Sequence, residues 1–441
     1  LLLSVQKPGR YTGNEPGSIV KDKSKVDVRF AFCFPDTYEI GMSHLGIKIL
    51  YSQFNSKDYI WCERVFAPWT DFEAVMRENN IPLFALESHD PVKDFDIIGF
   101  TLQYELSYTN VLNMLQLGGI PLKSKDRVGL TPLVVAGGPC ACNPEPLADF
   151  VDIFFLGEGE EVDLEVIDLY KEYKAKGGTD KLEFLKLAAK IDGVYVPALY
   201  DVTYDAEGKV TEYIPKDGAP KTVSKRVMTD LDKAYYPKNL PVPFTEIVHD
   251  RAVMEIFRGC IRGCRFCQAG FIYRPVREKS PEVINREAFD LCQSTGYDEM
   301  SLSSLSTSDY SQIEPLLSEM IEWTGKEKIS LSLPSLRIDN FSPELLNKMK
   351  LIRKSGLTFA PEAGTQRLRD VINKNITEKD IMKSCATAFA GGYTAVKLYF
   401  MIGLPTETDE DIIGIAKLGQ KIVDLYYNVD GRPKGKGVNV S

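Results

Sequence analysis

Long apolar runs, a secretory leader and an excess of positive charge are all missing from this sequence. No stretch reaches the roughly 20 consecutive apolar residues that a membrane-spanning helix needs, and the first residues lack the pattern of a signal peptide. The net charge of -9 argues against general nucleic-acid binding, because phosphate binding needs clustered Lys and Arg. We therefore expect a cytoplasmic protein without a membrane partner.

The bulk composition is that of an ordinary globular protein. The chain has 441 residues, 44% of them hydrophobic and 26% charged, which is typical of a soluble protein with about two or three domains. It begins at Leu1 rather than Met and stops inside a predicted strand, so we expect the natural protein to extend further. Nine cysteines, an odd number, in a long chain without a leader disfavour a disulfide framework.

Three of the cysteines, Cys260, Cys264 and Cys267, lie within eight positions of one another. Glycines at positions 259 and 263 make a regular helix costly there and allow a loop to fold around a shared centre. Arginines flank the cysteines, and nearby positive charge lowers a thiol pKa and favours the thiolate that binds metal. The segment therefore predicts a thiolate-lined metal-binding loop.

Three thiolates suit a cubane iron-sulfur cluster with one iron left open better than they suit zinc. A structural zinc site needs four ligands, commonly two separated pairs, whereas here the nearest histidine is His249 and no second pair follows. The spacing Cys-x3-Cys-x2-Cys, with Phe266 before the last cysteine, resembles the motif of radical S-adenosylmethionine (SAM) enzymes. The resemblance implies that the open iron of a 4Fe-4S cluster chelates SAM, and that the reduced cluster cleaves SAM to a 5′-deoxyadenosyl radical.

The N-terminal half alternates short apolar runs with helical segments. After an irregular lead-in at 1–25, a strand is predicted at 26–34, and further apolar runs lie at 81–86, 96–102, 132–136 and 151–156. This alternation predicts a parallel sheet with helices on both faces. We expect a Rossmann-like domain over residues 26–190.

Ligands of such sheets bind at the carboxyl ends of the strands. The loop after the first strand, Asp36-x-Tyr38-x-x-Gly41, and the later pair Gly137-Gly138 resemble the cobalamin-binding domain that precedes many radical SAM domains. Tyr38 stands where that family has the histidine that ligates cobalt, and His44 is out of register to replace it. Two alternatives stay open: cobalamin binds without a protein ligand, or the domain binds nothing.

The second half begins after a bridge. Residues 191–246 predict a hairpin followed by a Pro-rich extended linker. Residues 247–441 then alternate strands and helices and predict a partial (β/α)6 barrel of the TIM type, as in radical SAM enzymes. The predicted elements are a strand at 253–257, a helix at 281–294, a strand at 299–304, a helix at 310–324, a strand from 329, a helix at 342–354, a strand at 357–360, a helix at 377–390, a strand at 395–403, a helix at 408–425 and a strand near 436–441.

Barrel sites form at the carboxyl ends of the strands, which is where the cysteine loop lies. By resemblance to the family, the other strand ends imply contacts with SAM. The residues concerned are Phe266, Tyr273, Ser303, Ser304, Glu362, Ile402, Gly403 and Glu407. Ordinary structural roles compete with these, since Ser303 and Ser304 also suit a turn. A buried Glu362 needs a partner, for which Arg367 or Lys397 is available.

Together, the motifs predict an oxygen-sensitive radical SAM enzyme that abstracts hydrogen from an unactivated C-H bond. They resemble one uncharacterised family of radical SAM proteins with a cobalamin-type N-terminal domain, and bound cobalamin implies methyl transfer as a second step. The resemblance also implies a low-potential electron donor such as flavodoxin or ferredoxin. Two alternatives remain: cobalamin-independent modification of RNA or protein with the N-terminal domain as a recognition module, and a non-catalytic iron-sulfur scaffold or sensor. The substrate is not predicted.

Overall fold

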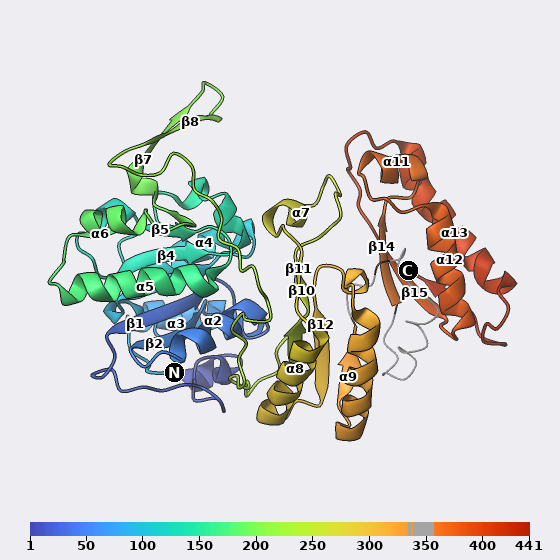
Figure 1. Ribbon diagram of the computed structural model, residues 1–441, viewed down its shortest axis with the longest axis horizontal. Helices are drawn as coiled ribbons and strands as arrows, with labels where there is room; N and C mark the ends of the chain where they lie inside the picture. Colours follow the sequence, from blue (N-terminus) through green and yellow to red (C-terminus); the bar gives the residue numbers. More distant parts are fainter. Residues whose placement is uncertain (334–336, 338–356) are drawn as a thin grey trace. The chain divides into compact units, whose positions relative to one another are not determined.

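The chain folds into two compact units. The computed structural model describes residues 1–333, 337 and 357–441 (Figure 1). The first unit comprises Leu1–Thr229 and Lys233–Asp250, and the second comprises Asp230–Asp232 and Arg251–Ser441. The helix predicted at 342–354 lies outside the described residues.

The first unit is built on a six-stranded sheet with the order β2-β1-β3-β4-β5-β6. All neighbouring strands pair in parallel except β5 and β6, which are antiparallel. The strands are β1 (Val28–Phe34), β2 (Ile60–Phe66), β3 (Ile97–Thr101), β4 (Leu133–Gly137), β5 (Ile153–Phe155) and β6 (Val194–Tyr195). Most of their side chains are buried, as expected of a sheet covered on both faces.

Helices cover both faces of this sheet. On one face α2 packs beside α5, where Gln53 donates to the Glu160 carbonyl, and on the other α3 meets α4 through Asn113 and Glu73 (Figure 1). The helices are α1 (Tyr38–Gly41), α2 (Leu45–Asn55), α3 (Thr70–Asn79), α4 (Tyr108–Leu117), α5 (Gly159–Ala175) and α6 (Lys181–Ala188). Short 3-10 turns occupy Leu2–Ser4, Pro8–Arg10, Val92–Asp94, Glu105–Ser107, Ser124–Asp126, Pro139–Cys142, Glu145–Leu147 and Pro197–Leu199.

The order of the first five strands is that of flavodoxin-like folds, in which the chain reverses its direction of winding between β1 and β3. Ligands of this architecture bind in the crevice outside the carboxyl ends of those two strands. The loops after Phe34 and Thr101 therefore form the edge where a ligand belongs.

Contrary to the prediction from the sequence pattern, the apolar run at 81–86 is not a strand of the sheet. Residues 81–86 form no strand and contribute only an isolated bridge between Phe84 and Pro91, whereas the edge strand is β2. Glu63 and Arg64 interrupt the apolar pattern of β2, although all seven of its residues are buried. The sequence pattern missed this strand because its charges are neutralised by residues from elsewhere in the chain.

The buried charge on Arg64 holds several segments together. Its side chain is 2% exposed and forms ion pairs of 2.7 Å with Glu15 in the lead-in and with Glu87. Its backbone N-H also donates to Glu87, and the hydroxyl of Tyr38 donates to Glu15 at 2.8 Å. The irregular lead-in is thereby tied to the sheet.

We expect Arg64→Met to lower the free energy of unfolding by about 3 to 5 kcal/mol, because it leaves two buried carboxylates without their counter-charge. The matched control is Arg77→Met, which removes a half-exposed helical pair with Glu73 and is expected to cost about 0.5 kcal/mol or less. Calorimetry of the full chain measures both. Equal losses for the two variants would contradict the structural importance of the Arg64 network.

A two-stranded hairpin extends from the first unit. Strands β7 (Tyr200–Tyr204) and β8 (Val210–Pro215) pair antiparallel around a turn in which Asp205 accepts from Lys209 N. Most side chains of the hairpin are exposed. The segment that follows contains no helix or strand up to β9 (Ala252–Glu255).

In the described part of the second unit, two parallel three-stranded sheets have the orders β13-β12-β9 and β14-β15-β16. Their strands are β9, β12 (Glu299–Ser303), β13 (Ser330–Ser332), β14 (Leu357–Glu362), β15 (Ala395–Phe400) and β16 (Asn439–Val440). A short antiparallel pair, β10 (Phe257–Arg258) and β11 (Arg277–Glu278), brackets the cysteine loop. The helices are α7 (Ala269–Ile272), α8 (Pro281–Thr295), α9 (Ile313–Glu327), α11 (Gln366–Val371), α12 (Glu378–Ala390) and α13 (Asp409–Asn428), with a 3-10 turn at Thr307–Asp309.

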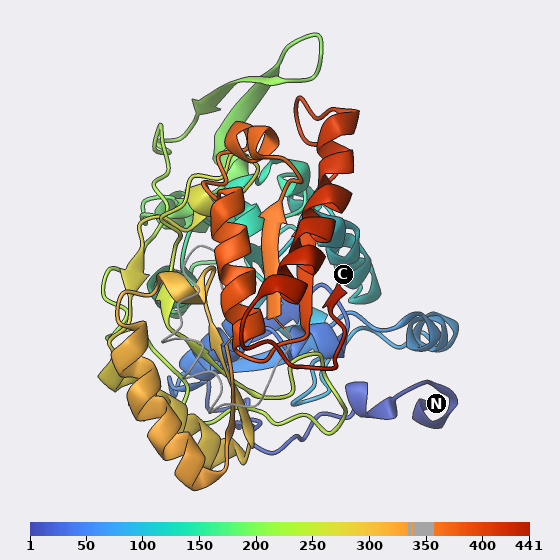
Figure 2. The same cartoon turned by 90° about the vertical axis from the view of Figure 1, so that its right-hand side faces the viewer.

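These six strands follow the chain order of the predicted barrel. Helices α12 and α13 pack against each other beside the β14-β15-β16 sheet (Figure 2). Val396 and Leu398 of β15 are buried, while the alternating Lys397 and Tyr399 are exposed. Within the described residues no pairing joins β13 to β14, so the barrel is not closed there. In the same residues, no helix combines the length and apolar character that crossing a membrane requires.

Candidate functional site

The cysteine loop lies between β10 and α7, directly after the first strand of the second unit. Gly259 opens the loop with φ +94°, and a Cβ there would lie 2.8 Å from the Tyr273 carbonyl oxygen and 2.7 Å from that of Pro275. Only glycine permits this close approach without strain. The glycine predicted to break a helix therefore brings the returning chain at Tyr273 against the start of the loop.

The three thiols are partly exposed and share one electrostatic neighbourhood. Burial raises the pKa of Cys264, the charges of Lys374 and Arg337 oppose that rise, and Cys267 and Cys260 add to it. The backbone N-H of Arg262 donates to the Cys260 sulfur, with 3.4 Å between nitrogen and sulfur. Three mutually influencing thiols beside cations and an N-H donor fit a group that binds as thiolates.

A cubane cluster places each cysteine sulfur on a separate iron atom. Its ligands therefore stand farther apart than those of a single metal ion. Among the described residues, no three His, Cys, Asp or Glu side chains are grouped closely enough to hold one ion.

An ion pair anchors the middle of the loop. Arg262 donates to both carboxylate oxygens of Asp309, at 3.1 and 2.5 Å, and Ser306 donates to the same carboxylate. The hydrogen bonds and positive charge of these partners, with that of Arg337, hold the pKa of Asp309 below its usual range despite burial. The segment after β12 therefore fixes the loop through Asp309.

A second anchor comes from the end of α11. The Arg265 N-H donates to the Ile372 carbonyl at 2.9 Å and its guanidinium donates to the Val371 carbonyl. The Asn373 side chain donates to the Gly263 carbonyl at 2.7 Å. Three hydrogen bonds thus join the cysteine loop to residues more than a hundred positions later in the chain.

Glu362 lies at the end of β14 in an unusual backbone conformation. Its φ of +69° falls in the left-handed region, at an irregularity in the pairing of β14 with β15. Its carboxylate accepts from Lys374 at 3.0 Å. The expected partners have other positions: Arg367 pairs with Asp411, and Lys397 is exposed beside the Tyr399 ring.

Lys374 was not identified from the sequence. It is buried between Asn373 and Asn375, both of which have left-handed φ values of +54° and +52°. Its ammonium is 5.9 Å from the centroid of the Phe266 ring, inside the cysteine loop. Asparagine tolerates the left-handed region, so the Asn-Lys-Asn sequence indicated a turn but gave no sign of its partners.

The turn after β15 is closed by one of its own side chains. Glu407 accepts from the Gly403 N-H at 2.6 Å. Gly403 has φ +90° with open space where a Cβ would lie, and Ile402 is 72% exposed. Backbone conformation rather than crowding therefore requires the glycine, and Ile402 remains accessible for an apolar contact.

Of the remaining predicted residues of this unit, the two serines lie at the end of β12 and Tyr273 follows α7. The Ser303 carbonyl accepts from Ile256 N, and the Ser304 hydroxyl is 3.1 Å from that of Thr307. Tyr273 ends α7, and its carbonyl accepts from Arg277. Ser304 therefore takes part in the turn after β12, and Ser303 ends the strand itself.

At the carboxyl edge of the first unit, Tyr38 faces away from a ligand. It is 2% exposed, its hydroxyl donates to Glu15, and its ring packs against Phe66. Asp36 accepts from Thr37 N and from the Tyr104 hydroxyl at 3.2 Å. The position that resembles the cobalt ligand therefore presents no side chain to the crevice.

The glycines of this edge are required by its own packing. A Cβ on Gly41 would collide with the Phe66 ring, and one on Gly138, which has φ +101°, would lie 2.7 Å from the Leu102 carbonyl oxygen. Gly137 is the last residue of β4 and has no such crowding. The glycine pattern thus reflects the turns after β1 and β4 and by itself implies no ligand.

His44 lies nearer the crevice and is also engaged. Its Nδ1 accepts from Ile47 N at 3.3 Å, which caps α2, and its ring lies 5.4 Å from that of Phe34 at the end of β1. Burial lowers its pKa to about 4, against a hydrogen bond with Gln103 at the end of β3. The imidazole is therefore neutral at pH 7, and its Nδ1 is occupied by the cap of α2.

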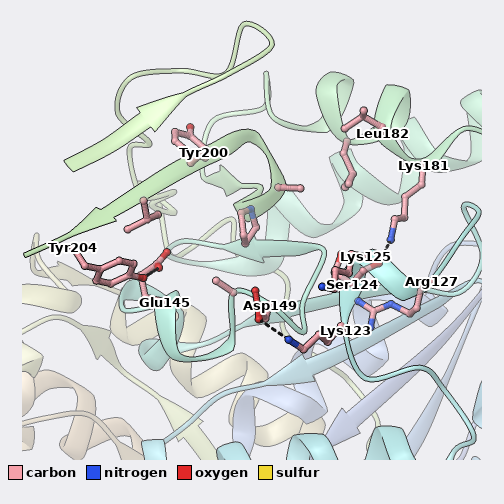
Figure 3. Close-up of a pocket in the computed structure, with 15 residues that line it drawn as sticks. Lys123, Ser124, Lys125, Arg127, Glu145, Asp149, Lys181, Leu182, Tyr200 and Tyr204 are labelled. Atoms are coloured by element: carbon pink, nitrogen blue, oxygen red, sulfur yellow. Dashed lines mark hydrogen bonds and ion pairs between the residues drawn. The ribbon is translucent and has the colours of Figure 1, made fainter. Parts of the chain in front are cut away.

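A separate hollow of about 420 Å³ opens near the amino-terminal ends of β4 and β5 (Figure 3). Several of its charged groups pair within the protein, including Lys123 with Asp149 at 3.3 Å and Lys181 with the Ser124 carbonyl at 2.7 Å. The Tyr204 hydroxyl donates to Glu145 in the same wall. These internal pairings make the hollow a weaker candidate than the strand ends.

Comparison with known families decides the assignment. The model for the radical SAM superfamily matches residues 254–419, and the model for the N-terminal region of radical SAM proteins matches residues 46–197. The chain belongs to the radical SAM superfamily. The superfamily predicted from the cysteine spacing is confirmed, and this radical SAM enzyme uses a 4Fe-4S cluster and SAM.

Some relatives of this radical SAM enzyme match most of its length. An uncharacterised protein of Methanocaldococcus jannaschii is 30% identical over 401 residues, covering 90% of this chain and 74% of the relative. The radical SAM methyltransferase TsrM of Kitasatospora setae, solved with cobalamin and a 4Fe-4S cluster, superposes with a TM-score of 0.60 at 12% identity, over 89% of this chain and 70% of TsrM.

The cobalamin-dependent radical enzyme OxsB, solved with aqua-cobalamin and SAM, superposes with a TM-score of 0.59 at 14% identity. The match covers 94% of this chain and 58% of OxsB, so the chain spans little more than half of that protein. These likenesses confirm the predicted α/β fold with a parallel sheet and a radical SAM domain.

We expect replacement of Cys260, Cys264 or Cys267 by Ser to abolish cluster assembly, because each thiolate is needed to hold a cubane with one open iron. The loss is measured after anaerobic reconstitution, as bound iron and sulfide and as the absorbance of the thiolate-to-iron charge-transfer bands. Cys142→Ser, which alters an exposed cysteine outside the loop, is the matched control. Retention of a full cluster by any of the three loop variants would contradict the ligand assignment.

We expect the stability of the protein to fall as the pH is lowered from about 6.5, the pKa of an unfolded histidine, towards about 4, the pKa of folded His44. In this window the unfolded state binds a proton that the folded state excludes, which costs at most about 3 kcal/mol.

His44→Asn keeps an oxygen acceptor for the helix cap but removes the titration, so its urea midpoint changes less between pH 7.5 and pH 4.5 than that of the wild type. His89→Asn, at an exposed histidine, is the control. An unchanged pH dependence in His44→Asn would show that other groups carry the effect.

Proposed function

We propose that this radical SAM enzyme cleaves SAM reductively and uses the resulting 5′-deoxyadenosyl radical to abstract hydrogen from an unactivated C-H bond of its substrate. In this proposal Cys260, Cys264 and Cys267 hold the cluster, and its open iron binds SAM. The observation that supports it most is the set of hydrogen bonds that joins the cysteine loop to the turn carrying Lys374, and through Lys374 to Glu362. That connection brings a strand-end carboxylate into the neighbourhood of the thiols.

The proposed SAM contacts come from the strand ends of the second unit, taken as residues 247–441. Glu362 supplies a carboxylate for a ribose hydroxyl or an amine. Ile402 supplies an exposed apolar contact for adenine beside the Gly403 turn that Glu407 closes. Phe266, Tyr273, Ser303 and Ser304 complete the set. When bound, the reduced cluster supplies the electron that splits the sulfonium bond.

We extend the proposal to cobalamin at the carboxyl edge of the Rossmann-like sheet, residues 26–190. The strand order, with its crevice between β1 and β3, and the similar folds of TsrM and OxsB support this site. The candidate contacts are Asp36, Gly41, Gly137 and Gly138. When bound, cobalamin supplies a methyl group for transfer to the substrate carbon.

Neither Tyr38 nor His44, both in the segment after β1, is placed to act as a ligand to cobalt. Tyr38 is buried with its hydroxyl bonded to Glu15, and His44 accepts a hydrogen bond from Ile47 N on Nδ1. We therefore propose that neither side chain ligates cobalt in this protein. Of the two alternatives left by the sequence, binding without a protein ligand is the one we adopt.

An electron must reach the cluster from outside the chain. We propose a low-potential donor such as flavodoxin or ferredoxin. The cytoplasm is the proposed location, since all nine cysteines are free thiols and a reducing compartment keeps them so.

The test is anaerobic. The chain is reconstituted with iron and sulfide, incubated with hydroxocobalamin, desalted and examined by absorbance, then given SAM and dithionite and assayed for 5′-deoxyadenosine. Cluster, corrin bands and deoxyadenosine together are the expected result. Cluster and deoxyadenosine without corrin would overturn the methyl-transfer step and favour cobalamin-independent modification of RNA or protein. A cluster without SAM cleavage would leave a scaffold or sensor role.

A further inference from the structure

The turn at residues 371–375 touches two parts of the site at once. On one side it meets the cysteine loop, where Ile372 and Val371 accept from Arg265 and Asn373 donates to Gly263. On the other side the Lys374 ammonium donates to the Glu362 carboxylate at 3.0 Å. Adjacent residues of one tight turn therefore hold the metal-binding loop and the strand-end carboxylate.

Both contacted segments need outside support. The cysteine loop has no strand or helix of its own between β10 and α7, so its carbonyls and N-H groups depend on partners elsewhere. Glu362 has a left-handed backbone, which costs a non-glycine residue of order 1 kcal/mol or more and persists only where the surroundings enforce it. The Met401 N-H holds the Glu362 carbonyl at 2.8 Å, but the carboxylate is held by Lys374.

The turn is itself rigidly formed. The Lys374 N-H donates to the Arg369 carbonyl, and the buried guanidinium of Arg369 donates to the carbonyls of Ala363 and Ile376. Asn373 and Asn375, on either side of Lys374, both adopt the left-handed conformation. The lysine is thereby presented from a fixed backbone rather than from a mobile loop.

We infer that the turn at 371–375 sets the position of Glu362 relative to the cluster, with Asn373 holding the cysteine loop and Lys374 acting as the positioning residue for Glu362. This inference rests on the proposed SAM-binding role of Glu362. It assigns different roles to the neighbouring side chains of Asn373 and Lys374. Asn373 governs retention of the cluster, and Lys374 governs affinity for SAM through Glu362.

The test compares variants of the full chain after anaerobic reconstitution. Asn373→Gly removes the amide but suits the left-handed backbone, and Asn375→Gly is its matched control at an exposed asparagine with the same conformation. We expect Asn373→Gly to lose iron to a chelator several-fold faster than the wild type, and Asn375→Gly to behave as the wild type. The SAM dissociation constant per cluster, measured by equilibrium dialysis of the oxidised protein, stays unchanged in both.

Lys374→Met is expected to keep a full, chelator-resistant cluster and to weaken SAM binding by about tenfold, the effect of losing one charge-assisted hydrogen bond. Its control is Lys379→Met, at an exposed lysine on the first turn of α12. Glu362→Gln weakens SAM binding similarly. The double variant, Lys374→Met with Glu362→Gln, binds SAM no more weakly than Glu362→Gln alone, because the lysine acts through the carboxylate.

The outcomes separate this inference from the proposed function. Additive losses of SAM affinity in the double variant would overturn the inference, and so would a Lys374→Met protein with wild-type SAM affinity. In either case the proposed function still stands if the wild type forms deoxyadenosine. Loss of the cluster in Lys374→Met with no change in Asn373→Gly would also overturn the inference. A wild-type chain that holds no cluster would overturn the proposed function, and the inference with it.

Discussion

The constraint on which the second unit depends is that three thiols must converge in a segment without regular backbone structure. Such a loop cannot satisfy its own polar groups, so the rest of the unit must supply partners. Here Asp309 holds the loop through Arg262, and the turn after α11 holds it through Arg265 and Gly263. These partners come from the segment after β12 and from the turn after α11.

The same dependence on distant partners shaped the first unit. A strand with charges at Glu63 and Arg64 forms one edge of the sheet because Arg29, Glu15 and Glu87 neutralise those charges inside the protein. Tyr38 belongs to this network through Glu15. Its burial therefore has a structural cause, independent of whether the nearby crevice holds a ligand. The residue at the position that resembles a cofactor motif, Tyr38, instead packs the lead-in against the sheet.

Each unit thus offers an edge of strand ends for binding, and the two edges are built differently. In the first, the strand ends carry glycines that their own turns require and a His44 whose Nδ1 caps α2. In the second, thiols, cations and Glu362 gather around the cysteine loop, which suits a charged cofactor held by direct contacts.

The sequence by itself determined the family, the cysteine loop, the hairpin and most of the strands and helices, because glycine placement, cysteine spacing and apolar periodicity are local properties. Only the tertiary structure decided that β2 is a strand, that Tyr38 is buried, and that Glu362 pairs with Lys374 rather than Arg367 or Lys397. These depend on which charges meet after folding. Ion pairs between residues distant in the chain leave no periodic pattern, so no local reading of the residues reveals them.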